Sequence, residues 1–360
     1  MTGKITVEEL SLPEELSGDG AADFLAAVEL IRQEHLRLWG NDHLAYTPEE
    51  MLNYAQDPYE RHLHLVARRD GALLGHCEII IPVEDNQHLV WVALTVHPDA
   101  QGTGIGRALA TATEDFARAQ GRLTVTFETS HPADSLAGEL LEPKSGIGQL
   151  PLVSRPVRFA RAAGYELEQV ERFSSCQLPV DPALLAEQGR LAQAAAGAEY
   201  RLVSWTSPCP EEWLDDLAWL QSRMSTDAPM AGLDFEEEPW DAARVRKGEA
   251  LAQQMGRTIL TTAVEHIPSG KLAGFTELIL LGHRSDVILQ GNTLVLHEHR
   301  GHRLGMLIKV ANLERLAEQR PDARCIYTWN AAENDYMLAV NIALGFTPAG
   351  FTGEWQKVLK

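Results

Sequence analysis

The sequence is poor in the features that mark secreted, membrane-spanning or metal-binding proteins. Its four cysteines, at 77, 176, 209 and 325, are scattered without CxxC spacing, which favours reduced thiols over disulfides or a zinc site. No apolar run approaches the roughly 18 residues that a transmembrane helix needs. The first ten residues also lack the apolar stretch of a signal peptide. These absences predict a cytoplasmic protein that does not interact with membranes.

Positive charge is scarce as well. Asp and Glu number 51 against 31 Lys and Arg, so the formal net charge is -20. A nucleic-acid binder needs a positive field to meet phosphates, so we expect no nucleic-acid partner. The acidic excess either serves solubility or attracts a cationic, amine-bearing substrate. A chain of 360 residues that is 45% hydrophobic is large enough for two ordinary globular domains.

Similar segments recur at a constant distance, which indicates an internal repeat. Two pairs are 199 positions apart: Gly71–Ile79 with Gly270–Leu278, and Gln101–Gly106 with Arg300–Gly305. A third pair, around Gly164 and Gly345, is 181 positions apart. The first half therefore holds an insertion of about 18 residues, for which the stretch Ser130–Pro156, rich in Pro, Gly and Ser, is the expected place. We predict two domains, residues 1–180 and 181–360.

Each half shows patterns of both strands and helices. Apolar spacing and end signals predict helices at Ala22–Trp39, Gly106–Gln120, Pro182–Ala198, Glu211–Met224 and Leu304–Gln319. Strand patterns in the first half occur at Leu63–Arg68, Leu73–Pro82, His88–Val96 and Leu123–Thr129, the second and third forming a hairpin. Those in the second half occur at Tyr200–Trp205, Thr258–Glu265, Leu272–Leu281, Val287–Leu296 and Arg324–Trp329.

A glycine-rich turn joins the expected strand His88–Val96 to the expected helix Gly106–Gln120. Helix N-termini present unpaired N–H groups with a partial positive charge, and glycine lets the backbone approach a bulky anion closely. The turn therefore suits a diphosphate. Glycines alone leave open a dinucleotide site or a tight structural turn. A dinucleotide fingerprint, however, would open a βαβ unit, whereas a hairpin precedes this turn.

The residues around the turn resemble a known motif. The order Gln101-Gly-Thr-Gly-Ile-Gly106, after Val96-His-Pro98, resembles motif A of the GNAT superfamily of N-acetyltransferases. The segment Phe159–Glu166 resembles the closing helix and strand of that family. The resemblance covers most of residues 5–178, and motif A is its specific part. An NAD-dependent dehydrogenase is the competing enzyme class, and it would require a true βαβ start.

The second half is similar to the same family, with a change in the loop. Thr293–Lys309 resembles motif A with Arg300 in the Gln/Arg position, but Arg303 stands where the family usually has Gly. Its long side chain either crowds the loop or pairs with a phosphate. Ala332–Phe346 resembles the family's last helix. The resemblance implies an α+β fold of two tandem GNAT folds, each a mixed, mostly antiparallel sheet flanked by helices, in a mycothiol synthase-like architecture.

The resemblance also implies an activity. An acetyl group would move directly from acetyl-CoA, the co-substrate, to a primary amine of a small cationic molecule, while strand N–H groups bind the thioester oxygen. The amine must lose a proton, and Glu78 and Glu277, at equivalent places in the two halves, are the candidate bases. Each has a plain alternative as an exposed strand residue or a partner for arginine. The implied cofactor contacts are Leu94, Thr95, Val96, Gln101, Gly102, Thr103, Gly104, Ile105, Gly106, Arg107, Val295, Arg300, Gly301, His302, Arg303, Leu304, Gly305 and Asn334.

Some family features have no counterpart. Many GNAT enzymes use a tyrosine on the final helix to reprotonate the CoA thiolate, but the matching residues are Ala160 and Asn341, and Tyr336 is off register. This gap keeps open a non-catalytic acyl-CoA-binding or ligand-sensing protein. The intact glycines favour the N-terminal half as the main cofactor site. The acidic, aromatic segment Asp227–Trp240 is a candidate for shaping the acceptor site of the other half, and Glu128 is a weaker candidate base.

Two further questions concern metals and assembly. The loop histidines at 297, 299 and 302 lack a nearby acidic cluster with ligand spacing, so no metal site is expected. A monomer and a homodimer are both compatible with the sequence.

Overall fold

The computed structural model describes residues 3–18 and 20–360, and the chain divides into two compact units. Unit 1 contains the chain up to Val170 together with Ala231–Asp234 and Gly350–Lys360. Unit 2 contains Glu171–Met230 and Phe235–Ala349. This division follows contacts, whereas the predicted division at residue 180 follows the repeat. The two differ because the last strand of the chain pairs within unit 1, and the division at 180 stays a prediction.

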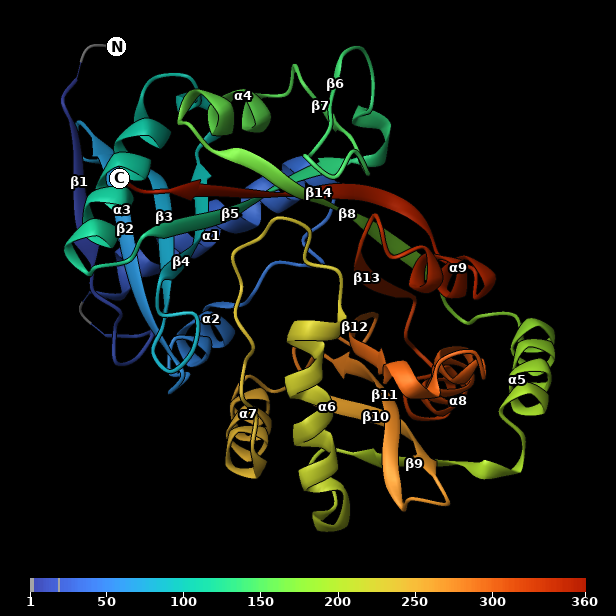
Figure 1. Cartoon of the computed structure of the whole chain (residues 1–360). Coiled ribbons are helices and arrows are strands. Elements are labelled where there is room, and N and C mark those ends of the chain that lie inside the picture. The colour runs from blue at the N-terminus through green and yellow to red at the C-terminus, as the bar shows by residue number, and fades with distance from the viewer. Residues whose placement is uncertain (1–2, 19) are drawn as a thin grey trace. The chain divides into compact units, whose positions relative to one another are not determined.

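Unit 1 is built on a mixed, mostly antiparallel sheet (Figure 1). Only β4 and β5 are parallel neighbours among the pairs described for this unit. The sheet order is β1 (Ile5–Leu10), β2 (Glu60–Arg69), β3 (Ala72–Pro82), β4 (Leu89–Val96), β5 (Thr124–Pro132) and β14 (Thr347–Val358). Its helices are α1 (Ala21–Trp39), α2 (Pro48–Tyr54), α3 (Ile105–Ala119) and α4 (Arg155–Ala162). The predicted insertion contains a small hairpin of β6 (Leu140–Leu141) and β7 (Leu150–Pro151).

Unit 2 repeats this plan (Figure 1). Its one described parallel pair is β12 with β13. The sheet order is β8 (Glu166–Gln177, paired through Glu171–Gln177), β13 (Cys325–Ala331), β12 (Val287–Val295), β11 (Lys271–Leu280), β10 (Thr258–His266) and β9 (Tyr200–Thr206). Its helices are α5 (Pro182–Ala196), α6 (Leu214–Asp227), α7 (Ala242–Gln254), α8 (Leu304–Gln319) and α9 (Asp335–Ala343). Short 3₁₀ turns of the chain occur at Pro98–Ala100, Ala133–Ser135, Gly197–Glu199, Glu211–Trp213 and His297–His299.

The two faces of the unit 1 sheet carry different side chains. Cys77, Ile79 and Ile81 alternate along β3 and pack in one core cluster with residues of α3 and α4. The intervening residues His76 and Glu78 therefore point to the opposite face, on which α1 and α2 form a second cluster. Polar side chains in a buried strand must find partners on that face.

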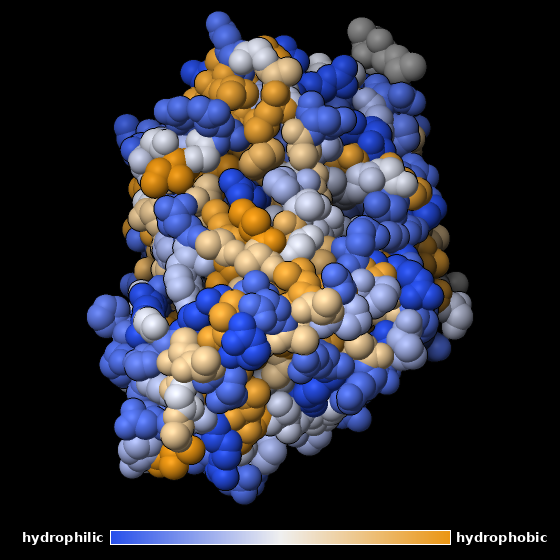
Figure 2. Space-filling model, turned by 90° about the vertical axis from the view of Figure 1, so that its right-hand side faces the viewer, coloured by the Kyte–Doolittle hydropathy of each residue, from blue (hydrophilic) through white to orange (hydrophobic). Residues whose placement is uncertain are grey.

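Most predicted elements of this plan are confirmed. The predicted hairpin is the antiparallel pair β3–β4, and α1, α3 and α8 begin within one residue of their predicted starts. The sequence did not predict β1, α2 or α7. Within residues 3–18 and 20–360, no helix combines the length and the apolarity that crossing a membrane requires. The face shown in Figure 2 carries hydrophilic residues throughout, with hydrophobic ones in several separate areas.

Candidate active site

The glycine loop of unit 1 has the backbone that a diphosphate cradle requires. Gly102 and Gly104 have φ angles of 79° and 99°, in the left-handed region that glycine adopts without strain. Gly104 is the N-cap of α3, and a Cβ placed on Gly102 would meet nothing within 4 Å. In the described part of the chain, the amides of Ile105, Gly106 and Arg107 have no recorded acceptor, as expected at a helix start. N–H groups at a helix start form a suitable anion site.

Gln101 connects this loop to the strand before it and to α4. Its Nε2 donates to the carbonyl of Val96 at 3.2 Å, and its Oε1 accepts from Arg155 at 3.2 Å. Gly106, one turn on, faces α4 so closely that a Cβ there would lie 3.3 Å from the Phe159 ring. The loop is therefore fixed in place by both neighbours before any ligand binds.

The strands β4 and β5 separate beside this loop. Their parallel pairing ends at Val92 with Phe127, whereas β4 stays paired with β3 up to Val96. The amide of His97 donates to the Leu74 carbonyl of the preceding hairpin at 2.9 Å. Because bonds alternate along an antiparallel strand, the amides of Leu94 and Val96 point the other way, toward the open side of β4. The backbone amide of Thr95, between them, points toward β3. Two predicted contacts thus present free donors.

The loop of unit 2 keeps the same backbone with different side chains. Gly301 has a φ of 87°, and Arg303, the N-cap of α8, has a φ of 55° in the place of Gly104. The Arg303 guanidinium donates to Gln188 of α5 at 3.1 Å. Arg300 repeats the Gln101 bond, with Nε donating to the Val295 carbonyl at 3.3 Å. Leu304 and Gly305 begin α8 as Ile105 and Gly106 begin α3, and β12 leaves β13 after Leu289.

Other predicted residues near this loop have structural partners. Asn334 caps α9, accepting the Met337 amide at 3.2 Å. His302 and His299 gather round Tyr200, whose hydroxyl lies 3.0 Å from Nδ1 of His299. No group of three or more His, Cys, Asp or Glu residues in the described parts of the chain is arranged to hold a metal ion.

Glu78 lies in a buried chain of histidines. Its Oε1 is 2.8 Å from Nδ1 of His62 and 3.7 Å from Nε2 of His64, whose Nδ1 is 3.0 Å from His76. Burial opposes protonation of His62, but its bonds with Glu60 and Glu78 outweigh this effect and raise its pKa to about 9. Burial likewise opposes ionisation of Glu78, yet His62 holds the pKa of that carboxyl below its usual value. At neutral pH the pair is a carboxylate and an imidazolium.

The surroundings of this pair differ on its two sides. Burial lowers the pKa of His64, and it lowers that of His76 to about 4, so both are neutral. On the other side, Ala93 stands directly opposite Glu78 on β4 and is exposed. Glu78 therefore lies one strand from the open side of β4, within a network that keeps it charged.

Glu277 has different electrostatics from Glu78. It is half-buried on the face where α6 and α7 pack, opposite a β-bulge at Gly291 and Asn292. Burial and the charge of Glu249 raise its pKa to about 7, against the opposing effect of hydrogen bonds from Gln221 and the Asn292 backbone. A carboxyl that titrates near neutrality can exchange protons at physiological pH.

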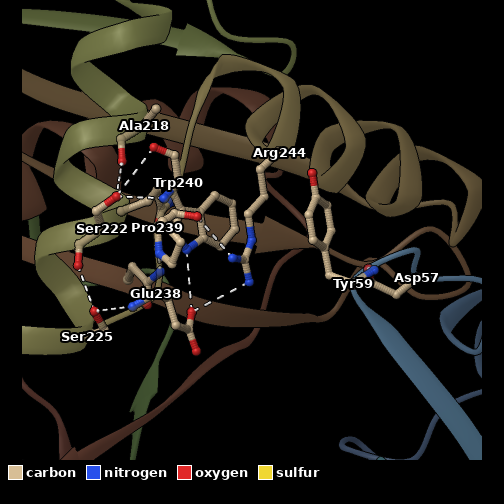
Figure 3. A network of polar contacts seen from close by, with 11 residues as sticks. Asp57, Tyr59, Ala218, Ser222, Ser225, Glu238, Pro239, Trp240 and Arg244 are labelled. Carbon is tan, nitrogen blue, oxygen red and sulfur yellow. Dashed lines mark hydrogen bonds and ion pairs between the residues drawn. The ribbon is translucent and has the colours of Figure 1, made fainter. Parts of the chain in front are cut away.

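Side chains of α6 pin the segment that follows it, and Figure 3 shows this network. The Ser222 hydroxyl accepts the Trp240 amide at 2.8 Å, and the Ser225 hydroxyl accepts the Glu238 amide at 3.1 Å. Arg244 lies over the Trp240 ring, 4.7 Å from its centroid. The acidic, aromatic segment predicted as Asp227–Trp240 is thus folded onto α6 at its end. Glu128, the weaker candidate, is an exposed residue opposite Glu354.

The two residues that match the position of the family's tyrosine lie in packed surroundings. Ala160 is fully buried, and Asn341 donates to Asn330 at 2.7 Å. Tyr336 belongs to α9, and its side chain reaches the start of α8, where a Cβ on Gly305 would be 3.9 Å from its hydroxyl oxygen.

Comparison with known proteins finds a family profile that matches part of unit 1. The sequence profile described as acetyltransferase (GNAT) family matches residues 28–140, which include β3, β4, the glycine loop and α3. The N-terminal unit contains a GNAT acetyltransferase domain. No curated protein sequence matches the chain significantly.

Solved structures extend the fold assignment to the whole chain. A tandem GNAT protein from the clavulanic acid biosynthesis pathway superposes with a TM-score of 0.73 at 24% identity, over 99% of this chain and 98% of that one. A GCN5-related N-acetyltransferase from Sphaerobacter thermophilus superposes with a TM-score of 0.60 at 15% identity, over 98% and 95%. The predicted tandem GNAT fold is therefore confirmed.

Sequence reasoning missed the histidines around Glu78. His62 and His64 alternate along β2, as His76 and Glu78 do along β3, which puts all four on one face. Polar residues at a spacing of two in otherwise apolar strands were the available signal. Unit 1 thus holds a buried polar cluster that contains one charged pair, Glu78 and His62.

Proposed function

We propose that this tandem GNAT protein is a cytoplasmic N-acetyltransferase that uses acetyl-CoA to acetylate a primary amine of a small, cationic molecule by direct transfer. The observation that carries the proposal is the combination in unit 1 of a left-handed Gly102/Gly104 loop with an unpaired strand edge at Leu94 and Val96. Acetyl-CoA supplies an acetyl group activated as a thioester. The chain has to bind its diphosphate, orient its carbonyl and remove a proton from the acceptor.

The cofactor residues of unit 1 divide by role. The backbone of Gln101–Arg107 binds the diphosphate through the amides at the start of α3, since those of Gln101 and Thr103 donate to Pro98 and Ala100, and the left-handed glycines leave room for it. The amides of Leu94 and Val96 donate to the thioester oxygen, and Thr95 holds this strand against β3. Contacts of a second cofactor with Val295, Arg300–Gly305 and Asn334 stay a prediction.

Glu78 is the proposed acidic group for the acceptor in unit 1. As a carboxylate it attracts an ammonium, and it takes up the proton through water on the Ala93 side. Because His62 neutralises part of its charge, Glu78 is a weak base, which is consistent with a water-mediated step. The acidic chain, with a net charge of -20, concentrates cationic acceptors in the same way.

A second candidate, a non-catalytic acyl-CoA-binding or ligand-sensing protein, is favoured by one observation. Neither Ala160 nor Asn341 can protonate a departing thiolate. In that case acetyl-CoA binds but no amine is acetylated.

The test is turnover of acetyl-CoA with a panel of amines, read as free thiol and as acetylated product. Glu78→Gln should lower turnover by about 10²–10⁴-fold while acetyl-CoA affinity is kept. Glu277→Gln is the matched control and should change turnover little. A large loss of turnover in Glu277→Gln with little change in Glu78→Gln would indicate that the reaction takes place in unit 2.

A further inference from the structure

A buried lysine lies where the cofactor cleft of unit 2 would be. Lys309 of α8 is 3% exposed, and its Nζ donates to Oε1 of Gln290 at 3.0 Å. The Phe346 ring lies on another side, 5.9 Å from Nζ to centroid. Burial lowers the pKa of Lys309 to about 7. A buried amine of this kind keeps its place only through the partners around it.

Gln290 stands at the point where the strands separate. The last β12–β13 pair is Leu289 with Tyr327, and Gln290 is the next residue of β12. Its Nε2 donates to the Glu277 carbonyl at 2.6 Å and to Thr276 Oγ1 at 3.1 Å, while its Oε1 accepts from Lys309. The amide is therefore bonded at one end to β11 and at the other to α8, beside the point where β12 and β13 separate.

The same places in unit 1 are small or apolar. Ala110 is four residues after Gly106, as Lys309 is four residues after Gly305. Val92 pairs with Ile79 as Gln290 pairs with Leu278, and Val92 is the last β4 residue paired with β5, while Gln290 directly follows the last β12 residue paired with β13. Lysine and glutamine in unit 2 thus replace alanine and valine in unit 1.

We propose that the Lys309–Gln290 pair closes the acyl end of the unit 2 cleft, so that the chain holds one acyl-CoA molecule, in unit 1. This inference rests on the proposed function, because it takes unit 1 as the cofactor site. An acyl-pantetheine arm entering unit 2 would have to displace Lys309 and leave the Gln290 amide without its partner. The unit 2 loop then serves as a turn from β12 into α8, which explains why Arg303 is tolerated there.

The experiment is a calorimetric titration of acetyl-CoA into the full chain. The natural protein should bind one equivalent, and Gln290→Val/Lys309→Ala, which copies unit 1, should bind two. If the double variant melts at a much lower temperature than the natural protein, Lys309→Ala alone takes its place in the titration. Lys247→Ala, at an exposed position of α7, is the control and should bind one.

Each outcome has a distinct meaning. Two equivalents bound by the natural protein would overturn the inference. Opened variants that remain folded and bind no more acetyl-CoA than the natural protein would also overturn it. No binding by the natural protein would refute the proposed cofactor site of unit 1. The opened variants would then still decide the inference, because they should gain one equivalent.

Discussion

Gln101 and Arg300 make the same hydrogen bond in the two units. Nε2 of Gln101 donates to the Val96 carbonyl at 3.2 Å, and Nε of Arg300 donates to the Val295 carbonyl at 3.3 Å. In each case a long side chain with an N–H donor reaches back five residues to the end of a strand. This bond turns the chain toward the helix, which explains why glutamine and arginine exchange at this position. The loop is conserved between the units as backbone geometry, not as side chains.

Gly104→Val should weaken acetyl-CoA binding at least tenfold. The φ of 99° is unfavourable for a β-branched residue, at a cost of about 1–2 kcal/mol, and the new Cβ would lie 3.4 Å from Ile5. Calorimetry measures the affinity. Gly121→Val is the matched control, because Gly121 has a φ of 72° and an open Cβ direction at the other end of α3. Equal affinities in both variants would exclude this loop.

Glu78→Gln should lower the unfolding free energy most at mildly acidic to neutral pH. The pKa of His62 is raised to about 9, so its stabilising effect is complete below the ordinary value of about 6.5 and is lost as pH rises through 9. We expect a loss on the order of 2–3 kcal/mol at pH 6 and a smaller one at pH 10. Urea unfolding at the two pH values measures it.

The control for this prediction is Glu187→Gln, which removes an exposed ion pair with Arg190 and should leave the unfolding free energy nearly unchanged at either pH. If Glu78→Gln lowers the unfolding free energy equally at pH 6 and pH 10, then Glu78 does not raise the pKa of His62.

Glu277→Gln should stabilise the protein at alkaline pH. The raised pKa of Glu277, about 7, means that the folded state holds a proton more tightly than the unfolded state. Stability from this group is therefore present below its ordinary pKa of about 4.5 and lost as pH rises through 7. At pH 8 the unfolding free energy of the variant should exceed that of the natural protein by on the order of 1–3 kcal/mol, and at pH 4.5 the two should differ little. A less stable variant at pH 8 would contradict this electrostatic account.

Ser222→Ala should release the segment that ends at Trp240. The Ser222 hydroxyl is the acceptor of the Trp240 amide at 2.8 Å, and losing it costs about 1–2 kcal/mol (Figure 3). Hydrogen exchange at the Trp240 amide should accelerate by roughly tenfold. Ser269→Ala, in the β10–β11 turn, should leave that amide unchanged. Unchanged exchange in Ser222→Ala would show that other contacts hold the segment.

The sequence predicted the elements that rest on local patterns. The strand–loop–helix unit around Gln101 carries its own signals in glycine spacing and apolar periodicity. A similar segment 199 residues later, at Arg300, predicts the same unit in the second half. The helix α2, which the periodicity did not predict, also has a local signal, since Thr47 and Glu50 form a capping box.

Features that depend on distant partners were not predicted. The pairing of β14 with β5 joins Val358 to Thr124, and no local pattern specifies such a partner. The same holds for Lys309 and Gln290, each unremarkable in sequence until the fold brings them to 3.0 Å. For Arg303, the sequence showed a lost glycine, but only the structure showed that the left-handed backbone is kept.

The most direct test of the proposed function is a mass-shift screen in which the natural protein and Gly104→Val are incubated with acetyl-CoA and a panel of cationic amines. The account predicts that at least one amine gains a single acetyl group with the natural protein, with release of one thiol per product, and that Gly104→Val forms much less product. Acetyl-CoA binding without acetylation of any amine would contradict the account and favour the non-catalytic alternative.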